Sequence, residues 1–324
     1  MNHMSYKRFL TALKEKLEEH LGEGRKVSLS EVVKPNLGKL DAFVIHQEER
    51  ESSSASPIFY TKPYYEDYRK GKSMDEMVEE IAALYESHAP GVGKDKVQEL
   101  MRGYGIVRDR VYFRLMNTQR NKELLKDVPH FDYLDFSMVF YVLAGEGTKG
   151  MASIRITNDM LQGWHVDLEE LRQQAVENTE SLFPAGSKAL HTIVEEAFFK
   201  GGDEPPKDFW GTDESASILD DGDIAVLSNR KGINGFSVVL YKDYLQKLAD
   251  RIQNNLYILP SSIHEALVFA DTGDSGQAQI LRKMVLSVNR SGVVEDEDFM
   301  SDEVYYYDRD LGRLEIAKEV GCYV

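Results

Sequence analysis

The segment FSMVFYVL, residues 136–143, contains no charged side chain and almost no polar one. A run this short and this apolar is typical of a strand that lies near the centre of a sheet with both faces covered. Gly145, Gly147 and Gly150 follow it and predict a turn into an alternating strand at 152–156. Residues 111–116 alternate in the same way, so the sequence predicts antiparallel strands around 136–143.

Helices with one apolar face lie on both sides of these strands in the sequence. Ser73 and Glu76 form a capping box before one of them. A turn at 34–38 between two short extended runs predicts a β-hairpin. Further helices are expected from residue 5, at 94–102, from residue 167, at 188–200 and at 275–289, and further strands at 256–259, 266–270 and within 304–316. The predicted fold class is α+β, with mixed or antiparallel sheets and packed helices.

Two stretches in the second half of the chain match each other. Four residues recur 84 positions later: Ser153, Asp159, Leu161 and Gln162 return as Ser237, Asp243, Leu245 and Gln246. The later stretch is expected to be a hairpin of strands at 224–227 and 236–241, before a helix at 243–252. A duplicated hairpin and helix explains the match, and so does cap chemistry shared by two unrelated units.

The length of 324 residues favours two closely packed domains or one large one. We expect an N-terminal α+β region at 1–125 and a C-terminal α+β region at 126–324, and the two could also form one compact unit. The acidic, proline-containing stretch 201–223 is the best candidate for a linker.

The net charge of −16, from 39 basic and 55 acidic residues, restricts the kinds of partner. Phosphate backbones repel an acidic surface, so direct nucleic-acid binding is not expected, whereas a basic protein partner is favoured. No apolar run is long enough to span a membrane and the first residues lack a signal peptide, which predicts a cytoplasmic protein. The single cysteine, Cys322, excludes an internal disulfide framework.

The sequence predicts neither a metal site nor a cofactor. His191 and Glu195 share one face of an expected helix, but zinc needs three or four ligands. The acidic loop Asp220–Asp223 lacks the ordered ligands of a calcium loop.

The corner ILPSSIHEAL, residues 258–267, places polar side chains between two apolar strands. A catalytic interpretation makes Ser262 (or Ser261) the nucleophile, His264 the base and Glu265 the orienting acid. Neighbouring strand residues point to opposite faces, however, which favours a structural corner.

The segment VEDEDFMSDEVYYYDRD, residues 294–310, combines acids with three tyrosines. Carboxylates attract basic partners and tyrosines supply contact area, so the segment is a candidate binding surface. Its proposed members are Asp296, Asp298, Asp302, Tyr305, Tyr306 and Tyr307. The alternative is an acidic loop that leads to an edge strand.

Four longer segments are specific enough to compare with known families: SPIFYTKPYYEDYRKGKSMDEMVEEIAALYE (56–86), WHVDLEELRQQAVENT (164–179), NRKGINGFSVVLYKDYLQKLADRIQNNLYILPSSIHEAL (229–267) and MVLSVNRSGVVEDEDFMSDEVYYYD (284–308). Together they resemble an uncharacterised family from Gram-positive anaerobic bacteria, domain of unknown function 5688. The second half is also similar to another uncharacterised family, through Trp164–Asn178 and Tyr257–Glu265. Neither family supplies a catalytic assignment. The resemblance implies a bacterial cytoplasmic protein that is carried on mobile elements, where small acidic proteins sometimes inhibit host defence nucleases.

The resulting hypothesis is a non-enzymatic protein-binding module. A narrower version is a counter-defence inhibitor that presents carboxylates from Asp220–Asp223 and Glu295–Asp310 at phosphate-like spacing. The alternative is a hydrolase or metal-assisted enzyme with a site near Pro260–Glu265, joined by Asn229 or His191.

Overall fold

The structure is a computed structural model that describes residues 4–47, 58–87, 99, 100, 102–147, 150–200 and 224–318. Contacts divide the chain into two compact units, Met1–Val107 with Leu143–Ile154 and Arg108–Val142 with Arg155–Val324. Within the described residues, helices pack on three antiparallel sheets, which confirms the α+β class. The predicted division into regions 1–125 and 126–324 stays a prediction.

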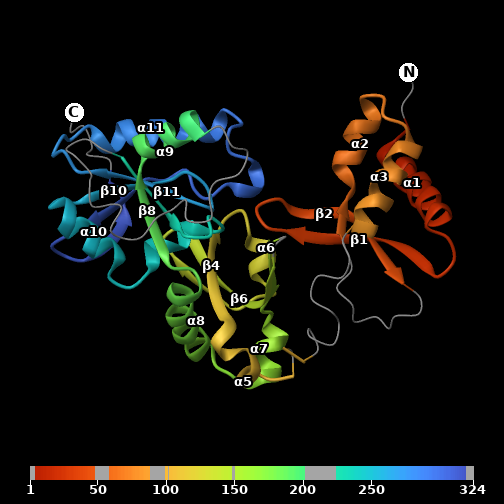
Figure 1. The fold of residues 1–324 in the computed structure, drawn as a ribbon, viewed down its shortest axis with the longest axis horizontal. Coiled ribbons are helices and arrows are strands. Elements are labelled where there is room, and N and C mark those ends of the chain that lie inside the picture. Colours follow the sequence, from red (N-terminus) through yellow and green to blue (C-terminus); the bar gives the residue numbers. More distant parts are fainter. Residues whose placement is uncertain are drawn as a thin grey trace. The chain divides into compact units, whose positions relative to one another are not determined.

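The first unit contains a three-stranded sheet with helices packed on it (Figure 1). Its elements include α1 (Tyr6–Leu21), β1 (Arg25–Lys34), β2 (Gly38–Gln47), β3 (Ile58–Tyr60), α2 (Thr61–Arg69) and α3 (Met74–Ser87). The strand order β1-β2-β3 confirms the predicted hairpin, and Asn36 and Gly38 take positive φ at its turn. Apolar residues of α1, β2 and α3 share one core cluster, in which Phe9, Leu13, Phe43 and Met77 are fully buried.

The predicted capping box at the start of α3 is confirmed. The backbone N–H of Ser73 donates to Oε2 of Glu76 at 2.8 Å, and the N–H of Glu76 donates to Oγ of Ser73 at 3.2 Å. Two N–H groups at the helix start therefore have partners without help from the rest of the fold. The helix expected at 94–102 lies largely outside the described residues.

The segment 136–143 lies in the middle of a four-stranded sheet. The elements around it are α5 (Tyr104–Val107), a 3₁₀ turn (Arg108–Arg110), β4 (Val111–Asn117), α6 (Lys122–Leu125), β5 (His130–Tyr133), β6 (Phe136–Gly147), β7 (Gly150–Arg155), α7 (Asn158–Trp164) and α8 (Leu168–Leu182). β6 pairs with β4 on one side and with β5 on the other, and β7 also pairs with β6, as the apolar run predicts. α8 packs along β4 (Figure 1), where Oγ1 of Thr179 accepts the N–H of Phe113 at 3.0 Å.

The second unit also contains a six-stranded sheet with the order β13-β12-β10-β11-β9-β8. Its elements are β8 (Ala185–Ala189), α9 (Leu190–Lys200), β9 (Ala225–Asn229), a 3₁₀ helix η3 (Gly235–Leu240), α10 (Tyr244–Ile252), β10 (Leu256–Pro260), β11 (Ala266–Ala270), α11 (Gln277–Arg290), η4 (Asp296–Asp298), β12 (Tyr305–Asp308) and β13 (Arg313–Ile316). α11 packs on one face of this sheet, because Leu281 and Val285 share a buried cluster with Leu259 of β10. The linker expected at 201–223 lies outside the described residues.

The prediction of a strand at 236–241 was wrong, because residues Gly235–Leu240 form the 3₁₀ helix η3. Both edges of β9 are already occupied, by β8 on one side and by β11 on the other. Residues 236–241 therefore have no free edge of β9 to pair with. Their apolar side chains are buried in a 3₁₀ helix instead. The matching stretch at Gly150–Arg155 is a strand, so the two similar stretches do not share their first element.

Within the described residues, no helix has both the length and the apolar character that crossing a bilayer requires.

Candidate functional site

The polar corner between β10 and β11 is held by hydrogen bonds among its own residues. Oγ of Ser261 donates to Oε1 of Glu265 at 3.1 Å, and Oγ of Ser262 accepts the backbone N–H of His264 at 3.0 Å. The carbonyl oxygen of Glu265 accepts the N–H groups of both serines. Hydrogen bonds between residues this close in sequence stabilise a turn, so both hydroxyls help to hold the corner in its conformation.

Both ring nitrogens of His264 have partners outside the corner. Nδ1 accepts the backbone N–H of Asn234 at 3.1 Å, and Nε2 lies 3.4 Å from Oδ1 of Asp298. A nitrogen that accepts an N–H carries no proton, so in the neutral ring the proton is on Nε2 and faces Asp298. His264 thus joins the loop before η3 to η4.

This arrangement differs from the relay proposed for Ser262, His264 and Glu265. In a relay the base holds the nucleophile on one ring nitrogen and the orienting acid on the other. Here the nitrogen opposite Asp298 faces the N–H of Asn234, and Glu265 is bonded to Ser261. The structure therefore brings His264 together with Asp298 and leaves Ser262 outside that pair.

The two residues proposed to join the corner come from different elements, Asn229 from the end of β9 and His191 from α9. Asn229 is buried and holds its own turn, with Nδ2 donating to the carbonyl of Ile233 at 2.8 Å. His191 lies on α9, which follows the edge strand β8. In the described part of the chain, no three His, Cys, Asp or Glu side chains are grouped as metal ligands would be. Asp220–Asp223 and Cys322 fall outside that part.

Each of the three aspartates predicted to form the acidic surface has a partner within the protein. Asp296 is 3.1 Å from Nη1 of Arg120, and Asp302 accepts Nδ2 of Asn289 at 2.8 Å. Asp298 faces His264, as described above. Asp296 and Asp302 remain exposed at their other sides, so they contribute negative charge to the surface while they hold the segment in place.

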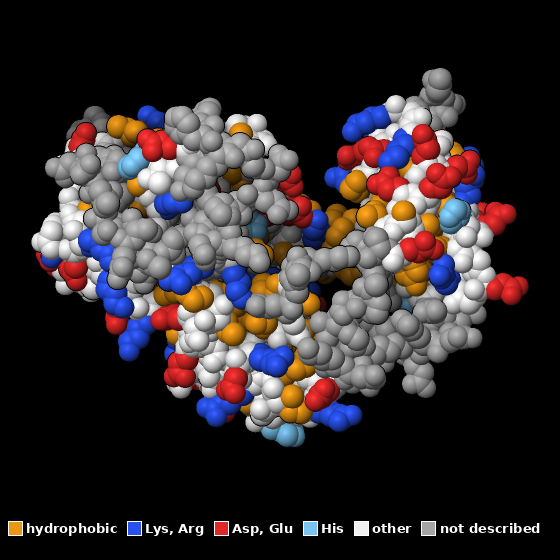
Figure 2. Space-filling view, viewed as in Figure 1, with side chains coloured by type: hydrophobic (Ala, Val, Ile, Leu, Met, Phe, Trp, Pro, Cys, Tyr) orange, Lys and Arg blue, Asp and Glu red, His pale blue; other side chains and the backbone are white. Residues whose placement is uncertain are grey.

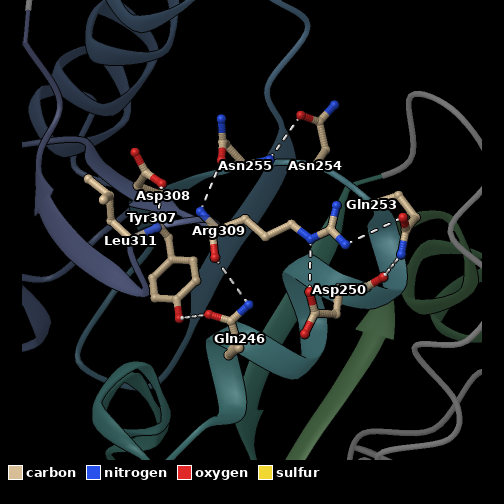
Figure 3. A network of polar contacts seen from close by, with 9 residues as sticks. All are labelled: Gln246, Asp250, Gln253, Asn254, Asn255, Tyr307, Asp308, Arg309 and Leu311. Atoms are coloured by element: carbon tan, nitrogen blue, oxygen red, sulfur yellow. Dashed lines mark hydrogen bonds and ion pairs between the residues drawn. The ribbon is translucent and has the colours of Figure 1, made fainter.

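Two of the three tyrosines proposed for this surface lie in the interior. Tyr305 and Tyr307 are buried, because alternate residues of β12 point to the same face. The hydroxyl of Tyr307 donates to Oε1 of Gln246 on α10 at 2.9 Å (Figure 3). Tyr306 is half-buried, and its hydroxyl donates to Oδ2 of Asp271 at 2.9 Å. The local sequence, rich in acids and tyrosines, could not reveal these distant partners.

The outer face of α11 carries an apolar row that our sequence analysis missed. Ile280, Met284 and Val288 are 59%, 42% and 39% exposed, and we call these three residues the outer stripe. They follow each other at intervals of four, so they lie in one row along the helix. Val293, just beyond the helix, is 78% exposed. The signal was present, since QAQILRKMVLSVNR contains two apolar rows at helical spacing and one row suffices to pack the helix.

Carboxylates border this helix. Glu303 is 2.7 Å from Nη2 of Arg282, and Asp302 is bonded to Asn289, so residues 302 and 303 lie against α11. On the face seen in Figure 2, acidic and basic side chains are interspersed among the coloured residues, without one large patch of either sign. Arg282 and Asn289 lie on the flank of α11 opposite the outer stripe, with the buried Leu281 and Val285 between them, so the acidic segment and the outer stripe are separate features of this helix.

Comparison with known proteins gives one match. The sequence model of a family of unknown function (DUF5688) matches residues 6–309. No curated protein and no solved structure matches the chain.

Proposed function

Because the chain belongs to DUF5688, a family of unknown function, we propose its role from its own surface: it is a non-catalytic binding protein that docks a basic protein partner. The observation that carries the proposal is the outer stripe of α11, on a chain whose net charge is −16. Single exposed apolar residues are common on protein surfaces, but a contiguous row is typical of an interaction site.

The net charge of the chain indicates the chemistry of the partner. α11 itself carries Arg282, which is paired with Glu303, and the exposed Lys283 and Arg290, so the negative charge is that of the chain as a whole, −16. A partner with an apolar ridge flanked by lysines or arginines would match both features. A second copy of the chain brings another −16 to the interface, so self-association is disfavoured by repulsion.

The corner supports the same proposal. The Ser261 hydroxyl donates to Glu265, Oγ of Ser262 accepts the N–H of His264, and the His264 ring lies between the N–H of Asn234 and Asp298, so these polar groups have partners within the protein. The narrower version, in which the basic partner is a host defence nuclease, rests on the family resemblance and on the net charge. It predicts that DNA competes with this chain for the partner.

A designed peptide tests the docking surface directly. The probe is a synthetic helical peptide with leucines on one face and lysines on the other, labelled for fluorescence anisotropy. We expect saturable binding that weakens as salt is added. Replacing Ile280 and Met284 together by Gln should weaken binding about tenfold, since two apolar contacts are lost. The matched control is Val194→Gln on α9, where an apolar residue is also 45% exposed.

Two results would contradict the proposal. One is an equal change of peptide affinity in the Ile280/Met284 double variant and in the Val194→Gln control. The other is a dimer in light scattering that the stripe variant dissolves, because the stripe would then be covered by a second copy.

A further inference from the structure

A cleft of about 300 Å³ lies at the start of α10 in the second unit. Its wall includes four tyrosines, Tyr133, Tyr241, Tyr244 and Tyr307, together with Asp243. The cleft involves neither the corner at 258–267 nor the outer stripe. It brings together segments that are distant in sequence, from β5, the end of η3, α10 and β12.

Three of the tyrosine hydroxyls are already hydrogen-bonded to protein oxygens. Tyr133 donates to the carbonyl of Leu314 at 3.1 Å, Tyr241 to that of Phe183 at 2.8 Å, and Tyr307 to Oε1 of Gln246 at 2.9 Å. These hydroxyls need no ligand for hydrogen bonding. Tyr241 and Tyr307 are buried, so the aromatic ring surface that a ligand can reach is that of Tyr133 and Tyr244, and the negative face of such a ring attracts cations.

Asp243 is the charged residue of the cleft. Of the described residues that line it, Asp243 alone carries a formal charge, and its side chain is exposed. It occupies the N-cap position of α10 but makes no side-chain cap bond, and its backbone has the left-handed φ of 55°. Within the described residues its carboxylate makes no hydrogen bond and no ion pair. An aspartate at an N-cap normally binds the helix N–H groups, so this one is free for a ligand.

Arg309 and Arg313, which are close in sequence to the cleft residues Tyr307 and Gly312, are each paired with another carboxylate. Arg309 is held by Asp250, with Nε 2.8 Å from Oδ1 (Figure 3), and Arg313 is 2.8 Å from Oε2 of Glu315. Burial first, and then the carboxylates of Asp250 and Asp243, raise the pKa of the Tyr307 hydroxyl. The described wall of the cleft thus combines tyrosines with one carboxylate.

We propose that this cleft binds the guanidinium group of an arginine side chain, with the planar cation against the tyrosine rings and its N–H groups on the carboxylate of Asp243. A guanidinium is planar, weakly hydrated and able to form two parallel bonds to one carboxylate. A metal ion fits poorly, since hard cations need several oxygen ligands. The amino end of α10 alone would favour an anion, but the free carboxylate at that end repels one.

The inference is independent of the proposed docking on α11, and a small probe separates the two. N-acetyl-arginine methylamide is titrated into the full chain by calorimetry, beside the citrulline analogue, which replaces the guanidinium by a neutral urea of the same shape. We expect saturable binding of the arginine probe, and binding of the citrulline probe that is at least about tenfold weaker.

The variant that tests the carboxylate is Asp243→Asn, because Asn tolerates the left-handed backbone as well as Asp does. We expect it to weaken arginine binding about tenfold or more. Asp109→Asn, an exposed aspartate in the 3₁₀ turn before β4, removes the same charge and should leave binding unchanged.

Three results would overturn the inference: equal binding of the citrulline probe, arginine binding that survives Asp243→Asn, or binding of inorganic phosphate in place of the arginine probe. The citrulline comparison uses the unaltered chain, so it remains decisive if the variant does not fold. If the unaltered chain bound the leucine–lysine peptide but not the arginine probe, the cleft would be rejected and the proposed docking surface would stand.

Discussion

The hydroxyl of Tyr305 donates to Oδ1 of Asp135 at 2.6 Å, across 170 residues of sequence. The second oxygen of the same carboxylate accepts Oγ of Ser301 at 2.5 Å. The ring of Tyr305 packs edge-on against Phe136 and is also close to Phe236. One aspartate therefore fastens the start of β12 and the acidic segment before it to the turn between β5 and β6.

We expect Tyr305→Phe to lower the free energy of unfolding of the second unit by about 1–3 kcal/mol, because it leaves a carboxylate oxygen without its donor while the ring packing is kept. Urea unfolding followed by circular dichroism measures the change. Tyr306→Phe is the control on the same strand: its hydroxyl donates to Asp271 from a half-buried position, so water can replace the lost partner. A larger loss for Tyr306→Phe than for Tyr305→Phe would contradict the assignment.

Alkaline pH should destabilise the fold through the same tyrosine. Burial, aided by the nearby Asp135 carboxylate, raises the pKa of Tyr305 well above its ordinary value of 10.0. In the unfolded chain the hydroxyl titrates near its ordinary pKa, so above about pH 10 the unfolded state loses a proton that the folded state keeps. Stability is therefore unaffected by this group below about pH 10 and falls as the pH rises towards the folded pKa. Urea midpoints measured from about pH 8 to about pH 11 should decline more steeply for the natural chain than for Tyr305→Phe. Equal slopes would show that Tyr305 is not responsible.

The elements that the sequence predicted correctly are those decided by near neighbours. The capping box needs only Ser73 and Glu76, and the β1–β2 hairpin needs only the turn at 34–38. The central position of 136–143 also follows locally, since a strand without polar residues must be covered on both faces.

The errors arose where partners are far away in the sequence. An apolar run such as 236–241 fits a strand or a buried helix, and the choice depended on β8 and β11 having already taken both edges of β9. The acids around Tyr305 in the sequence indicated a surface position, whereas its hydrogen-bond partner Asp135 lies in the distant turn between β5 and β6. The cleft at Asp243 could not be foreseen for the same reason, since its wall comes from four separate segments.

His264 should contribute to stability through its two ring contacts. Replacing it by Ala removes the acceptor for the N–H of Asn234, at a cost of about 1 kcal/mol, and also the contact with Asp298. Both side chains are about one-third exposed, so the contact between them adds less than about 1 kcal/mol. A double-mutant cycle of His264→Ala with Asp298→Ala measures that coupling by urea unfolding. If His264→Ala left stability intact and abolished turnover of an ester or phosphodiester, the corner would be catalytic after all.

The tightest packing beside the corner is at Gly235, and it gives the sharpest test of the fold. A methyl group on its Cα would lie 2.0 Å from Oγ of Ser228, 2.4 Å from the carbonyl oxygen of His264 and 2.7 Å from the N of Asn229. Two of these three atoms belong to the backbone and cannot rotate away, so η3 would have to move off β9. We expect Gly235→Ala to cost at least about 3 kcal/mol or to prevent folding of the second unit. Gly163→Ala in α7 is the matched control, because nothing lies within 4 Å of its added methyl group and alanine favours a helix, which should stabilise the unit by up to about 1 kcal/mol. Thermal and urea unfolding of the two variants should therefore differ in sign. A Gly235→Ala protein as stable as the natural chain would mean that η3 does not pack against β9 and the corner as described.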